Sequence, residues 1–60
     1  MNFEVAKAMA RERFVNELRM SGMPEDEIRK YVRTTHFEER VEILALDLLR
    51  YLRERGPGFP

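Results

Sequence analysis

A regular apolar stripe between residues 37 and 52 constrains the fold more than any other feature of this 60-residue chain. Its members are spaced by four, three, four and four residues, and they are Phe37, Val41, Leu44, Leu48 and Leu52. This spacing places every side chain of the stripe on one face of an α-helix, whereas a β-strand repeats every two residues. The sequence therefore predicts a long helix over residues 36–55.

Turn-forming residues in the middle of the chain separate two further helices. Ser21 and Gly22 end a helix predicted over residues 2–20, because glycine adopts the left-handed conformation that closes many helix C-termini. Pro24 then suits the first position of a short helix over residues 24–33, since its missing N–H costs nothing there.

The third predicted helix has its own start signal, and together the three helices define the fold class. Thr35 and Glu38 match a capping box, with Thr35 as the N-cap. We therefore expect an all-α fold, a long-short-long three-helix small bundle that forms a single helical domain over residues 1–55. The Gly- and Pro-rich residues 56–60 predict a flexible C-terminal tail.

The first predicted helix is apolar on two sides. One side carries Phe3, Ala10, Phe14 and Leu18, and the roughly opposite side carries Val5, Ala6, Met9 and Met20. In the third helix, Ile43 and Leu46 lie away from the main stripe. Two neighbouring apolar residues outside the core face, next to a two-faced helix, favour a second interface.

The small size of the chain makes a partner subunit the expected source of additional stability. A 60-residue chain buries only about 60% of the surface that its unfolded form exposes, so its own core is marginal, and such domains usually depend on disulfides, a metal or oligomerisation. With no cysteine and one histidine, disulfides are excluded, and we expect no metal site and no cofactor. We therefore expect a homo-oligomer, most simply a dimer with twofold symmetry.

The charge distribution argues against nucleic acid as the partner. Eleven basic and eleven acidic side chains give a formal net charge of zero, whereas nucleic-acid binders usually carry a basic excess. The turn at Gly22 has the spacing of a helix-turn-helix, but the helix after it begins with Glu25, Asp26 and Glu27, which phosphates would repel. If nucleic acid were bound, the contacts would come from the basic cluster Arg50, Arg53 and Arg55.

Titratable side chains give no sign of catalysis. The one cluster worth weighing is His36 with Glu38, Glu39 and Glu42, and no nucleophile accompanies it. Three short helices seldom enclose a cleft of enzyme size. We therefore expect no enzymatic activity, and we interpret the cluster as a solvated helix start.

The hydropathy and charge patterns bear on whether the chain contacts a membrane. No apolar run approaches the roughly 18 residues of a membrane span, and acidic Glu4 interrupts any signal-peptide pattern at the N-terminus. The polar helix faces mix both signs of charge, which does not suit a membrane surface. We expect a cytoplasmic protein without membrane contact.

The short second helix carries a resemblance to a known family. It reads Pro24-Glu25-Asp26-Glu27-Ile28-Arg29-Lys30-Tyr31-Val32. From Phe14 onward, this part of the chain resembles the SinI/SinR family of small antirepressors and repressor dimerisation domains, which share a helix, a turn and a short helix. The family often has tryptophan at the start of the first helix, whereas this chain has none and adds a long third helix. The resemblance implies a dimerisation hook packed by Leu18, Met23, Ile28, Tyr31 and Val32, with the chain itself or a related regulator as partner.

These features together favour a protein–protein interaction module. We expect a homodimeric regulatory or antirepressor-like protein that buries faces of its first and third helices against a partner. The expected interface residues are Phe14, Leu18, Met23, Ile28, Tyr31, Val32, Ile43 and Leu46. Two alternatives stay open: a small DNA-associated transcription regulator that uses the basic patches of a dimer, and a structural or assembly subunit whose only role is oligomerisation.

Overall fold

Three helices form the chain in the computed structural model, which describes the backbone of residues 2–55 and the side chains of residues 2–54. They are α1 (Phe3–Met20), α2 (Glu25–Tyr31) and α3 (Thr35–Arg55). No strand occurs in that range, so the all-α, long-short-long prediction is confirmed. The tail predicted for residues 56–60 lies outside the described part.

Both ends of α1 follow the sequence signals. The Asn2 side chain accepts a hydrogen bond from the Val5 N–H at 2.9 Å. At the other end, the N–H of Met23 bonds to the carbonyl of Leu18 and the N–H of Gly22 to that of Arg19, at 3.2 and 3.1 Å. With Gly22 at a φ of 98°, these two bonds form a Schellman motif, which satisfies carbonyls that a helix end leaves free.

The joint between α2 and α3 differs from the prediction. Pro24 lies just before α2 in extended backbone, and α2 ends at Tyr31, two residues earlier than expected. Thr34, not Thr35, caps α3, because its hydroxyl accepts the Phe37 N–H at 3.1 Å while donating to the Tyr31 carbonyl at 2.7 Å. One threonine thus ends α2 and starts α3, so the predicted capping box at Thr35 is wrong.

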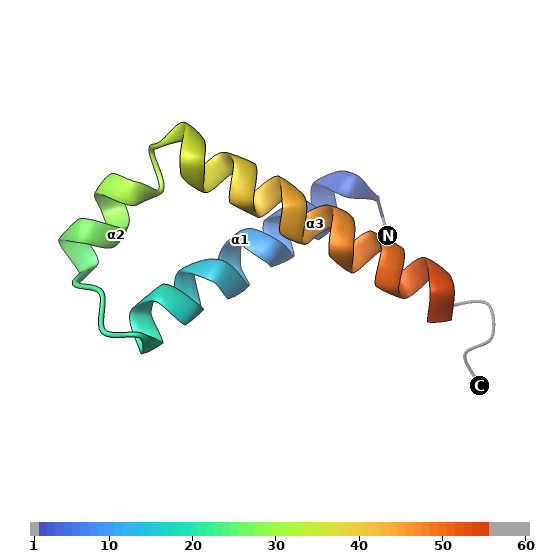
Figure 1. Ribbon diagram of the computed structural model, residues 1–60, viewed down its shortest axis with the longest axis horizontal. Helices are drawn as coiled ribbons and strands as arrows, with labels where there is room; N and C mark the ends of the chain where they lie inside the picture. The colour runs from blue at the N-terminus through green and yellow to red at the C-terminus, as the bar shows by residue number, and fades with distance from the viewer. Residues whose placement is uncertain (1, 56–60) are drawn as a thin grey trace.

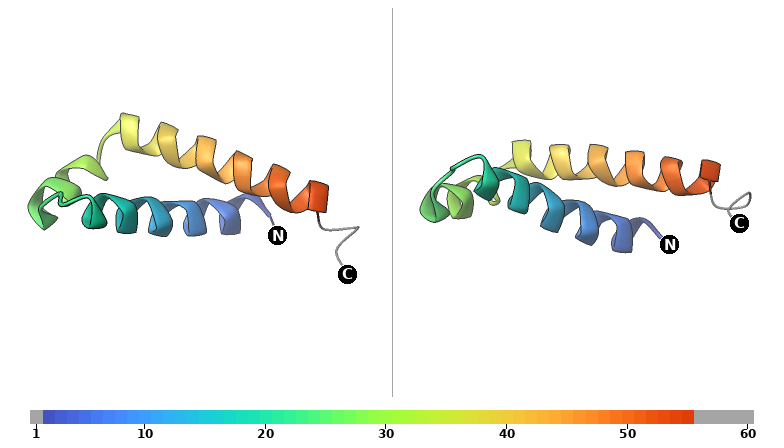
Figure 2. Two further views of the ribbon diagram at one scale, coloured as in Figure 1. Left: turned by 60° about the horizontal axis from the view of Figure 1, so that its bottom comes forward. Right: turned by 90° about the horizontal axis from the view of Figure 1, so that it is seen from below.

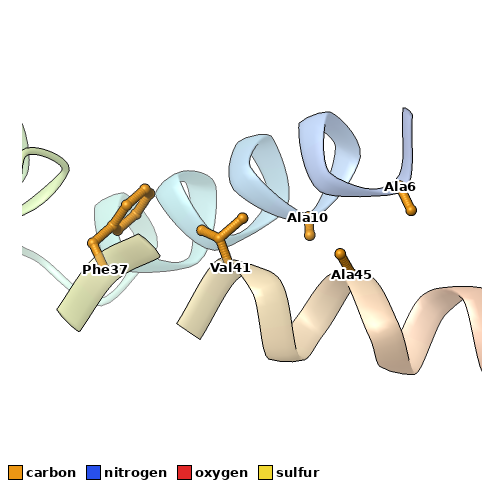
Figure 3. Close-up of a cluster of buried hydrophobic side chains, with 5 residues drawn as sticks. All are labelled: Ala6, Ala10, Phe37, Val41 and Ala45. Carbon is orange, nitrogen blue, oxygen red and sulfur yellow. The ribbon is translucent and has the colours of Figure 1, made fainter. Parts of the chain in front are cut away.

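The core lies between α1 and α3, which run side by side in opposite directions (Figures 1 and 2). It consists of Ala6 and Ala10 from α1, and Phe37, Val41 and Ala45 from α3, as Figure 3 shows. Small side chains where the helices meet allow their backbones to approach closely. Ala6 was expected on the side of α1 opposite Ala10; that prediction is wrong, because both alanines are buried against α3.

An aromatic cluster attaches α2 to the end of this helix pair. The ring of Phe14 stacks on Phe37 at 5.4 Å between centroids, and Tyr31 meets both rings edge-on at 6.1 and 5.4 Å. Such edge-on and stacked pairs contribute about 0.5–1.5 kcal/mol beyond the area they bury. Ile28 is the one buried residue of α2 itself.

The molecule is flat. Its principal extents are 42, 22 and 13 Å, and its radius of gyration is 13.3 Å, against about 10 Å for a compact domain of this length. In the view down the shortest axis, α1 and α3 cross, and the N-terminal part of α1 lies behind α3 (Figure 1). Because α2 sits at the end of the α1–α3 pair and not over it, no other helix of the described residues covers the broad faces of the pair.

Candidate interaction surfaces

An apolar groove follows the contact between α1 and α3 on one side. It has a volume of about 610 Å³. Its lining is formed by Met9, Ala10, Arg13 and Glu17 from α1, and by Leu44, Asp47, Leu48 and Tyr51 from α3. Met9 is 48% exposed and Tyr51 is 53% exposed, although methionine is among the residues most often buried.

Ion pairs between the two helices involve a different set of side chains. Lys7 approaches Glu38 and Glu42 at 3.7 and 3.9 Å, and Arg11 bonds to both carboxylate oxygens of Glu38 at 2.9 and 3.3 Å. The Arg11 guanidinium also lies 5.7 Å from the centre of the Phe37 ring. None of these charged residues lines the groove, so the pairs tie α1 to α3 without covering it.

The charges of the groove itself have no such partners. Within residues 2–54, Arg13, Glu17 and Asp47 form no ion pair at 4 Å or less. All three side chains are exposed. The groove thus combines an apolar floor with unpaired charges of both signs.

A second apolar surface lies on the far side of α3. Ile43 and Leu46 are 53% and 58% exposed. By the helical period they face away from Val41 and Ala45, which pack on α1. The two residues form an exposed apolar ridge on α3 that shares no residue with the groove. Their predicted place off the main stripe is thereby confirmed, and their role as an interface stays a prediction.

The residues of the predicted hook pack inside the chain. Ile28 is buried, and Phe14, Leu18, Tyr31 and Val32 pack against the core. Met23 is half-buried in the turn after α1. These contacts hold α2 to the helix pair, so the hook has a structural role within one chain. A role in contacts between chains stays a prediction.

A bidentate ion pair links the acidic start of α2 to α1. Arg19 donates from Nε and Nη2 to the two carboxylate oxygens of Glu25, at 2.6 and 3.1 Å. The hydrogen bond from Arg19 lowers the pKa of Glu25 below its usual value, and the same bond raises the pKa of Arg19. At the position where a helix-turn-helix would meet DNA, a carboxylate therefore stays ionised.

The basic cluster at the end of α3 is only partly described. Arg50 and Arg53 are exposed and lie three residues apart, which places them on one face of the helix. That face also carries Ile43 and Leu46. Arg55 ends α3, and its side chain is outside the described part.

The side chains around His36 make contacts between the helices and so have a structural role. The Tyr31 hydroxyl and the His36 Nδ1 are 2.7 Å apart, which links α2 to the start of α3. Glu38 and Glu42 are engaged by Lys7 and Arg11. Among the described residues, no group of three or more His, Cys, Asp or Glu side chains is placed to hold a metal ion.

The groove was not predicted from the sequence, although the sequence contains a pattern that points to it. The apolar positions of α3 span a wider arc than one neighbouring helix can cover, and Met9 lies on the second apolar side of α1. Combining the two patterns into one surface requires knowing how α1 and α3 are rotated about their axes.

In the described part, no helix is both long and apolar enough to cross a membrane.

Comparison of the chain with protein-family models, with curated proteins and with solved structures gives no match.

Proposed function

We propose that this chain is a helical protein–protein interaction module that acts as a homodimer. The observation that carries the proposal is that α2 lies at the end of the α1–α3 pair, so that no third helix of the described residues covers the broad faces of that pair (Figure 1). Stable domains bury the apolar faces of their helices between at least two layers. A helix pair without such a cover leaves apolar side chains exposed, and association with a second chain is the simplest way to cover them.

The size of the core supports the same proposal. The buried hydrophobic residues of the described part are Ala6, Ala10, Ile28, Phe37, Val41 and Ala45, so half of them are alanines. Alanine contributes little apolar area, and a small domain is marginal even with a full core. Binding that favours the folded state adds directly to its stability.

The biological role that fits such a module is regulatory. The resemblance of residues 14–32 to the SinI/SinR family makes the partner a second copy or a related regulator. In this proposal the chain acts by occupying a helix face of its partner, and it has no catalytic step. Neither a membrane nor DNA is needed for that mechanism.

Sedimentation equilibrium of the full chain over a wide concentration range tests the proposal. We expect a reversible monomer–dimer equilibrium, with the dimer dominant at the highest concentrations. A chain that sediments as a monomer throughout would contradict it. Pull-down from the source organism then separates two roles, because a regulator recovers another protein and an assembly subunit recovers only itself.

Arg50 and Arg53 support a second candidate, a DNA-associated regulator. Both are exposed and unpaired within the described residues, and they share one helix face. Binding through such residues falls steeply with salt, because phosphate contacts release counterions. A mobility-shift assay at low salt that shows no retarded DNA would exclude this candidate.

A further inference from the structure

We propose that the groove between α1 and α3 is the site where a second copy of this chain binds, so that two flat protomers stack into a four-helix bundle. This inference rests on the proposed homodimer and adds which surface forms it. The groove is a hollow lined by residues of both long helices, whereas the Ile43–Leu46 ridge belongs to α3 alone.

The charges around the groove are suited to a second copy of the same surface. Arg13 is basic, whereas Glu17 and Asp47 are acidic, and all three are unpaired within the described residues. In a twofold dimer each surface meets its own copy, so every contact occurs twice. Arg13 of one protomer can then lie beside a carboxylate of the other, and the reverse contact forms by symmetry.

Overall electrostatics do not oppose this pairing. The formal net charge of the chain is zero, so two copies carry no net repulsion. The inter-helix ion pairs of Lys7 and Arg11 with Glu38 are formed within one chain and can remain intact in the dimer. In the proposed dimer, the charged side chains that gain new neighbours are Arg13, Glu17 and Asp47, which form no ion pair within the described residues.

The broad side of the molecule is large enough to hold a standard interface. A rectangle of 42 by 22 Å encloses it, which bounds its area at on the order of 900 Å², and each partner of a standard interface contributes about 800 Å². Stacking two protomers places a second pair of helices over each groove. If α1 of each copy lies on α3 of the other, every neighbouring pair of helices is antiparallel, as in many four-helix bundles.

Paired substitutions in the full chain locate the interface. The variant Met9→Glu/Tyr51→Glu places two carboxylates in the groove, at side chains that are already half exposed. The matched control Ile43→Glu/Leu46→Glu makes the same chemical change on the ridge. We expect the groove variant to raise the dimer dissociation constant about 100-fold or more in sedimentation equilibrium, and the control to change it less than about tenfold.

The outcomes separate this inference from the proposed function. A wild-type chain that is always monomeric contradicts both. A wild-type dimer that survives in the groove variant overturns the inference and leaves the homodimer standing. A dimer that only the ridge variant breaks also overturns the inference, because it places the interface on the far side of α3.

Charge-swap variants keep the test decisive if the groove variant fails to fold. Arg13→Glu makes the groove more acidic and Asp47→Arg makes it more basic, and neither removes an ion pair within residues 2–54. We expect an equal mixture of the two variants to form heterodimers in native mass spectrometry in preference to either homodimer. A statistical distribution of dimers would overturn the inference, and misfolding cannot imitate a preference for the mixed pair.

Discussion

Gly22 is the residue whose backbone conformation the turn between α1 and α2 requires. Its φ of 98° lies in the left-handed region, while no heavy atom beyond Gly22 and its two chain neighbours lies within 4 Å of the place where a Cβ would be. A substitution there is opposed by the backbone conformation and not by lack of space. The Schellman motif that ends α1 depends on this conformation.

Gly22→Ala should therefore destabilise the fold by about 1 kcal/mol, the typical cost of left-handed backbone for a residue with a Cβ. Urea unfolding followed by circular dichroism measures the change. Gly22→Asn is the matched comparison, because asparagine tolerates this conformation better, and it should lose less stability than the alanine variant. Equal losses for the two variants would contradict a purely conformational cause.

Glu25 makes stability depend on pH through its bond to Arg19. Because the pKa of Glu25 is lowered in the folded state, the unfolded chain takes up a proton first as the pH falls. The contribution of the pair is fully present above the ordinary pKa of 4.5 and disappears as the pH falls through the lowered value. Both side chains are exposed, so salt should weaken the effect.

In Glu25→Gln, the acid-side decline in unfolding free energy should be shallower than in the wild type. The two proteins should differ at neutral pH and converge in strong acid, as measured by urea unfolding at a series of pH values. Glu27→Gln is the control, since Glu27 is also exposed and forms no ion pair within the described residues. A constant difference at all pH values would show that the pair does not titrate as described.

At the level of elements, the close approach of α1 and α3 depends on small residues. Ala45 is fully buried opposite Ala6 and Ala10 of α1. A larger side chain there has no free volume and would push the helices apart. Ala8, by contrast, is exposed on α1 and meets no such constraint.

Ala45→Leu should accordingly destabilise the chain by about 1–3 kcal/mol, the usual cost of overpacking a close-packed core. Ala8→Leu, the same substitution at an exposed helix position, should stay within about 0.5 kcal/mol of the wild type. Thermal unfolding of both variants at equal concentration checks the pair. Similar stabilities for the two would mean that the α1–α3 contact can adjust more freely than its burial indicates.

At the scale of the whole molecule, the proposed dimer would couple folding to association. If the second copy binds only the folded chain, dilution should lower the melting temperature. We expect the midpoint of thermal unfolding, followed by circular dichroism, to rise over an about hundredfold increase in concentration. A midpoint independent of concentration would indicate a monomer that is stable without a partner.

The sequence by itself determined the elements. Helical spacing, Asn2, Gly22 and Pro24 gave three helices whose bounds agree with the structure within two residues, because these signals act over one or two turns of local backbone. The exposed pair Ile43 and Leu46 was found for the same reason, since a helical period fixes which residues share a face.

Only the tertiary structure decided what those faces meet. The rotation of α1 about its own axis buries Ala6, and the end position of α2 leaves the broad faces of the helix pair without a third helix among the described residues. The use of Thr34 in place of Thr35 as the cap follows from how α2 and α3 join. These features depend on contacts between residues distant in sequence, such as Phe14 with Phe37, and local periodicity carries no information on them. The groove between α1 and α3 therefore exists only in the folded chain.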